Sequence, residues 1–76
     1  MSKIELAVNV RHDVNGRQVP LSIIWEDGRM FSVDKILDVR RAASLKAGGV
    51  GMRYICKIGG KRVALFDDEG QWFMET

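Results

Sequence analysis

Apolar and polar residues alternate along most of this 76-residue chain, and a period of two predicts β-strands rather than helices. In the first segment Ile4, Leu6, Val8 and Val10 fall on one side, and the residues between them are polar or alanine. The same alternation returns after each pair of turn-forming residues. It predicts six strands, at residues 3–14, 17–26, 29–39, 51–58, 61–68 and 71–75.

Four dipeptides each lie between two consecutive predicted strands: Asn15-Gly16, Asp27-Gly28, Gly59-Gly60 and Glu69-Gly70. The first three predict two-residue hairpin loops, because Asn, Asp and Gly tolerate the positive φ of a type I′ turn. The pairing after Glu69-Gly70 is counted as if that loop also had two residues. Counting outward from the first two loops pairs Val10 with Leu21, Val8 with Ile23, Leu6 with Trp25, Glu26 with Arg29, Trp25 with Met30 and Ile24 with Phe31. Counting from the last two pairs Lys57 with Arg62, Cys56 with Val63, Ile55 with Ala64, Tyr54 with Leu65, Arg53 with Phe66 and Phe66 with Phe73.

The predicted fold class is mainly β, a single domain over residues 1–76. Its six strands form an antiparallel meander that curls into a small barrel or a strongly bent sheet, since closure would remove exposed sheet edges. Pro20 should lie at the start of the second strand, beyond the ladder shared with the third. The alternative is an α+β fold with a helix at about residues 35–46, capped by Asp34. Helical spacing would place Arg40 on the apolar face, so we expect the third strand to continue, bent, toward Val39, with a short helical turn or loop after it.

Composition agrees with one folded domain, because 46% of the residues are hydrophobic and 29% are charged. No apolar run reaches the 18 residues that a membrane span needs. Cys56 is alone and the first residues do not resemble a signal peptide, so we expect a cytoplasmic protein. A domain of this size without disulfides or metal ligands has a small core, and homodimerisation is one way to enlarge it.

Charge is distributed unevenly along the chain. Residues 39–62 hold seven basic residues and no acidic one, whereas the rest holds five basic and all ten acidic residues. The formal net charge of +2 therefore conceals a block of +7 beside flanks that sum to −5. An asymmetry of this kind can direct a protein toward an anionic partner.

Part of this basic block falls on one face of the hairpin predicted from the strands at 51–58 and 61–68. Arg53 and Lys57 share a side of their strand, with Phe66 and Arg62 opposite them. Cations mixed with aromatic rings are typical of surfaces that bind single-stranded nucleic acid. The candidate binding residues are therefore Arg53, Lys57, Arg62, Arg40, Arg41 and Phe66, with Lys46 as an undecided extension. The competing interpretation places Ile55, Phe66 and Phe73 in the core of a barrel, with the cations at its rim.

Catalytic, metal and cofactor motifs are weak by comparison. Gly48, Gly49 and Gly51 indicate a flexible connection but lack the spacing of a phosphate-binding loop. His12 is expected at the surface, and Cys56 is expected to be a small buried hydrophobe. The acidic run at residues 67–69 is interpreted as a solvated turn, and both tryptophans, Trp25 and Trp72, as core anchors. We therefore expect no cofactor, and an enzyme is disfavoured.

These observations predict a binding module without enzymatic activity that uses the basic hairpin face. Nucleic acid is the leading ligand, and an acidic protein surface would satisfy the same charges. The alternative is a protein-interaction or homodimer module that docks through the apolar side of the last two hairpins. A membrane is not among the expected partners.

Four segments of the chain, PLSIIWEDGR, KILDVRRAASLKAGG, GMRYICKIGG and the closing WFMET, resemble a group of short, uncharacterised bacterial proteins of similar length. The resemblance covers nearly the whole chain. It implies a bacterial domain that stands alone, and it implies no activity, ligand or functional residue.

Overall fold

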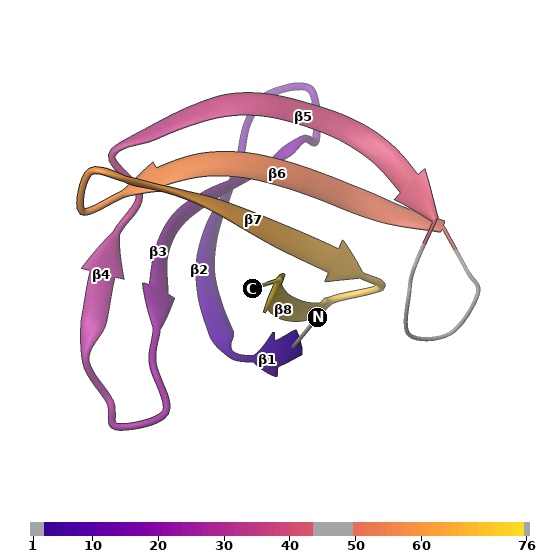
Figure 1. The fold of residues 1–76 in the computed structure, drawn as a ribbon. Coiled ribbons are helices and arrows are strands. Elements are labelled where there is room, and N and C mark those ends of the chain that lie inside the picture. Colours follow the sequence, from indigo (N-terminus) through magenta and orange to yellow (C-terminus); the bar gives the residue numbers. More distant parts are fainter. Residues whose placement is uncertain (1–2, 44–49, 76) are drawn as a thin grey trace.

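The computed structural model describes residues 3–43 and 50–75, and within them it confirms a mainly β protein (Figure 1). All strand pairs are antiparallel. The strands are β1 (Lys3–Glu5), β2 (Ala7–His12), β3 (Gln18–Ile24), β4 (Met30–Ser32), β5 (Lys35–Ala43), β6 (Val50–Ile58), β7 (Lys61–Asp68) and β8 (Gln71–Glu75).

These strands form two sheets, with the orders β1-β8-β7-β6-β5 and β2-β3-β4. The described residues form no closed barrel, so the predicted single six-stranded meander is not confirmed. The reason is that two of the long predicted strands break. Each one contributes its first half to one sheet and its second half to the other, as strands do at the corners of packed sheets.

The first break is at Leu6, whose N–H bonds to the carbonyl of Trp72 at 3.2 Å. The second is at Val33 and Asp34, whose consecutive amides bond to different sheets: Val33 to the carbonyl of Leu21 and Asp34 to that of Lys57, both at 2.8 Å. Beyond this corner the chain continues as β5 as far as Ala43, because residues 40–43 pair with β6. The expected turn or loop directly after Val39 is therefore wrong. The alternative of a helix at 35–46 is therefore wrong for residues 35–43, and residues 44–46 lie outside the described part.

The first two hairpins have three-residue loops rather than the predicted two. Asp13 N–H bonds to the Arg17 carbonyl at 3.0 Å, and Gly16, at φ 79°, has positive φ while Asn15 does not. The Asp13 carboxylate accepts the Asn15 and Arg17 amides, both at 2.9 Å, which stabilises this wider turn. The second hairpin is the same, with Trp25 rather than Glu26 bonded to Arg29.

A bulge in the β2–β3 ladder shifts the pairing of the first hairpin by one residue, so that the predicted register holds on one side of the bulge only. It lies between Asn9 and Val10, so that Val10 is opposite Pro20, not Leu21, while Val8 is opposite Ile23 as predicted. Leu21 is left unpaired in this ladder and is 46% exposed. The β3–β4 ladder has no such bulge and stays one residue out of the predicted register, with Ile23 opposite Phe31.

The last two hairpins confirm their predicted pairing. Lys57 is opposite Arg62, and Phe66 is opposite Arg53 on one side and Phe73 on the other. Their loops are two residues long, and both loop residues have positive φ, 59° and 78° at Gly59-Gly60 and 51° and 90° at Glu69-Gly70. Pro20 also lies where predicted, outside the β3–β4 ladder, which involves Ser22 to Ile24.

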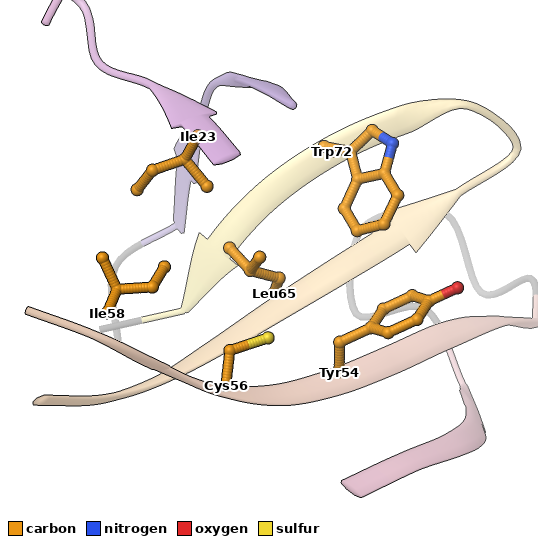
Figure 2. Close-up of a cluster of buried hydrophobic side chains, with 6 residues drawn as sticks. All are labelled: Ile23, Tyr54, Cys56, Ile58, Leu65 and Trp72. Carbon is orange, nitrogen blue, oxygen red and sulfur yellow. The ribbon is translucent and has the colours of Figure 1, made fainter. Parts of the chain in front are cut away.

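The main core fills the space between the two sheets (Figure 2). Its centre is Leu65 and Cys56, both at 0% exposure, and the rings of Tyr54 and Trp72 pack at 5.2 Å beside them. Burial of Cys56 and Trp72 is as predicted, and Trp25 is half-buried against the same cluster. The full cluster is Ile23, Tyr54, Cys56, Ile58, Leu65 and Trp72.

A second apolar group lies on the other face of the larger sheet. Phe66 and Phe73 are 2% and 1% exposed, and their rings stack with centroids 5.3 Å apart; Ile55, beside them, is 8% exposed. Gly51 lies within β6, and a Cβ there would meet Phe66 Cε1 at 2.7 Å and the Asp67 carbonyl oxygen. Gly51 therefore provides space for close packing, not the predicted flexible connection. Gly48 and Gly49 lie outside the described residues.

Candidate functional site

Three cations lie side by side across β5, β6 and β7. Lys35 is directly opposite Lys57, and Lys57 is directly opposite Arg62. Directly opposite residues share one face of a sheet, and adjacent strands are about 4.8 Å apart. We call Lys35, Lys57 and Arg62 the cation row; its outer members are on strands about 10 Å apart.

All three side chains of the cation row are exposed, and none forms an ion pair with a residue that the structure describes. Asp34 lies beside the row, but its carboxylate accepts a hydrogen bond from Gly59 N–H at 2.9 Å. Like charges directly opposite each other destabilise a sheet. The row is therefore a place where a bound anion would relieve repulsion within the fold.

The adjacent pair of arginines on the same face is different. Arg40 is opposite Arg53, but Arg40 pairs with Asp38 at 2.7 Å and Arg53 with Glu75 at 3.6 Å. These carboxylates offset much of the positive charge. Arg40 and Arg53 thus extend the basic face without matching the uncompensated charge of the cation row.

Two other sequence candidates are not part of this surface. Arg41 is opposite Met52, which puts it on the other face of the sheet. Phe66 is on the correct face, but its 2% exposure leaves no ring surface for a base to stack on. Lys46 lies outside the described residues.

Lys35 is the member of the cation row that sequence reasoning missed. It falls in the third predicted strand, whose pairing with the next strand does not follow from a short hairpin loop. The pairing depends on a bulge between Ile36 and Asp38, which has no clear sequence signal. At this bulge the apolar residue Leu37 is 42% exposed.

The structure also places the residues considered for catalysis. His12 is exposed on β2, as predicted, and Cys56 is fully buried. Burial raises the pKa of the Cys56 thiol to about 11, so it is protonated at neutral pH and is a poor nucleophile. Among the described residues no cluster of His, Cys, Asp or Glu is placed to hold a metal ion. Asp67 is 9% exposed, so the predicted solvated turn is wrong at its first residue.

A membrane-spanning helix is absent from the part of the chain that the structure describes. Comparison of the chain with protein-family models, with curated proteins and with solved structures found no match.

Proposed function

We propose that this protein is a binding module without enzymatic activity whose cation row contacts the phosphate backbone of a nucleic acid. The observation that carries the proposal is the direct juxtaposition of Lys35, Lys57 and Arg62 on one exposed face, without acidic partners in the described residues. Charges that repel one another in the free protein lower the net cost of placing an anion between them.

The mode of binding that fits this surface is backbone contact rather than base stacking. Phe66 and Phe73 are buried against each other, so they are not available to bases as the ring-and-cation pattern predicted. Lysine and arginine contacts to phosphates position a protein on nucleic acid but carry no sequence information. The proposed binding is therefore weak, independent of sequence and strongly dependent on salt.

The apolar alternative has less support on the same face. The last two hairpins bury Ile55, Phe66 and Phe73, whereas the most exposed large hydrophobic residues in the described part, Val14 and Met30, belong to the other sheet and its turn. A homodimer or a protein partner docked on the last two hairpins would thus find few apolar contacts there. The exposed charges of the cation row are therefore the feature of these hairpins that best supports binding.

The test is fluorescence anisotropy with labelled single-stranded DNA, single-stranded RNA and duplex DNA over a range of salt concentrations. Three phosphate contacts predict a slope of log K against log salt of about −2 for single strands. The double variant Lys57→Glu, Arg62→Glu should lose binding. The single variant Lys57→Glu has Arg11→Glu as its matched control, because each reverses one exposed cation and Arg11 is on β2, in the smaller sheet.

Binding that is undetectable at low salt for all three nucleic acids would overturn the proposal. So would equal loss of affinity in the Arg11→Glu control and in a single Lys57→Glu variant, because the effect would then reflect net charge. Binding to an acidic protein under conditions where nucleic acid fails would favour the other anionic partner instead.

A further inference from the structure

A cleft of about 750 Å³ opens between the β2–β3 hairpin and the larger sheet. This volume lies within the range of small-molecule sites. Its walls come from both sheets: Gly16 and Val19 on the hairpin side, and Ile36, Val39 and Met52 on the side of β5 and β6. The apolar residues form a surface on which a short hydrocarbon stem could pack.

Polar groups also line this cleft. The Tyr54 hydroxyl donates to the Gln18 carbonyl at 3.3 Å, which joins the hairpin to β6. Figure 2 shows Tyr54 beside Trp72 at the edge of the buried cluster, with its hydroxyl directed away from the other side chains. Asp67 lines the same cleft from β7, and the hydrogen bond that fixes it within the described residues comes from Gly70 N–H at 2.9 Å.

One polar atom in this wall has no hydrogen-bond partner among the described residues. The side-chain oxygen of Gln18, Oε1, is buried and accepts no hydrogen bond from them. A buried acceptor without a donor destabilises the fold. A ligand N–H group would remove that destabilisation once the Gln18 side chain turns its oxygen into the cleft.

Charge defines which ligand fits. The ionisable residues of the cleft wall are Asp13, Asp67, Arg17 and Tyr54, and Arg17 is next to Asp13 across the turn, which offsets that pair. Asp67 is the remaining charge of this wall. Arg41, opposite Met52 on the same face, is not a wall residue but lines a separate hollow with Asp67. Burial, and after it the negative charge of Asp67, raises the pKa of the Tyr54 hydroxyl. Phosphates and carboxylates are thus disfavoured here, in contrast to the cation row.

We propose that this cleft binds a small organic cation, an ammonium or guanidinium group on a short apolar stem. The cationic head donates to Gln18 Oε1 and faces the Asp67 carboxylate, while the stem covers Ile36, Val39 and Met52. The same chemistry is available from a free alkylguanidine or amine and from an arginine or lysine side chain of a peptide. The site does not depend on the nucleic-acid function proposed for the cation row.

The test is an NMR titration of the full chain with butylguanidinium, its neutral isostere butylurea, and the anion valerate. Butylguanidinium should give saturable shifts at the amides of Gln18, Tyr54 and Asp67, with none at Lys35, Lys57 and Arg62. N-acetyl-arginine amide tests whether the natural ligand is a peptide side chain. Tighter binding of this compound than of butylguanidinium would favour a peptide. Butylurea that binds as tightly as butylguanidinium, or no shifts at about 10 mM, would overturn the proposal.

Two variants locate the interaction. Asp67→Asn removes the charge but keeps an oxygen that can accept from Gly70, and it should weaken binding about tenfold or more. The matched control Glu69→Gln removes the same charge from the neighbouring turn, outside the cleft wall, and should change affinity by less than about twofold. Equal losses in the two variants would contradict the site. If Asp67→Asn does not fold, Gln18→Met still tests it, because it deletes the acceptor at similar volume and should also weaken binding.

Discussion

Replacing Lys57 with glutamate should make the protein more stable and, at the same time, remove its affinity for nucleic acid. Lys57 is the middle of the cation row and is opposite both Lys35 and Arg62. The substitution converts two repulsive cross-strand pairs into two attractive ones. Opposite-charge pairs contribute about 0.2–1 kcal/mol each, so two give about 0.4–2 kcal/mol before the relieved repulsion is counted.

The assay is thermal and urea denaturation at low and at high salt. For a domain of this size 1 kcal/mol corresponds to a rise in Tm of about 4–8 °C, and screening should reduce the rise as salt increases. Lys61→Glu is the matched control, because it makes the same charge change in the same hairpin but opposite Ile58. A Lys57→Glu variant that is no more stable than Lys61→Glu, or that is more stable yet still binds nucleic acid, would refute the reasoning.

Three further predictions concern the packing. Gly51→Ala should lower the free energy of unfolding by about 2 kcal/mol or more, because the new Cβ meets the backbone of Asp67; a urea midpoint equal to wild type would contradict this. Leu65→Ala should lower it by about 2–5 kcal/mol in the same measurement, since Leu65 is fully buried, and a loss below 1 kcal/mol would argue against a packed core. The free energy of unfolding should also fall as pH rises from 9 toward about 11, because the Cys56 thiol, whose usual pKa is 9.0, ionises in the unfolded chain while burial keeps it protonated in the fold. That fall is on the order of 2–3 kcal/mol, and Cys56→Ala should show a shallower profile.

The hairpins whose pairing could be predicted in full are those with two-residue loops. Gly59-Gly60 and Glu69-Gly70 adopt positive φ at both positions, so the register from β6 to β8 follows by counting. Asn15-Gly16 gives the same signal in the sequence, but Asp13 precedes it and its carboxylate binds two loop amides. A side chain outside the dipeptide thus decides the loop length, which the dipeptide alone does not reveal.

The candidate site was predictable to the same extent. The pairing of Lys57 with Arg62 is local, so it followed from the loop between them. Lys35 joins them only through the pairing of β5 with β6, which depends on a bulge and on a corner at Val33 and Asp34. The burial of Phe66 also depends on distant residues, since Gly51 provides the space for its ring. Sequence periodicity describes which side a residue faces, but not what covers that side.

The pairing of β1 with β8 has a consequence for how the chain folds. Ile4 meets Met74, so this contact joins residues about 70 positions apart, whereas the β6–β7 and β7–β8 hairpins close over a few residues (Figure 1). Long-range pairing carries a high loop-closure entropy and slows folding. We therefore expect the β6–β8 hairpins to form early and β1 to dock last. During synthesis, residues 3–5 cannot form their native pairing with β8 until residues 71–75 have left the ribosome.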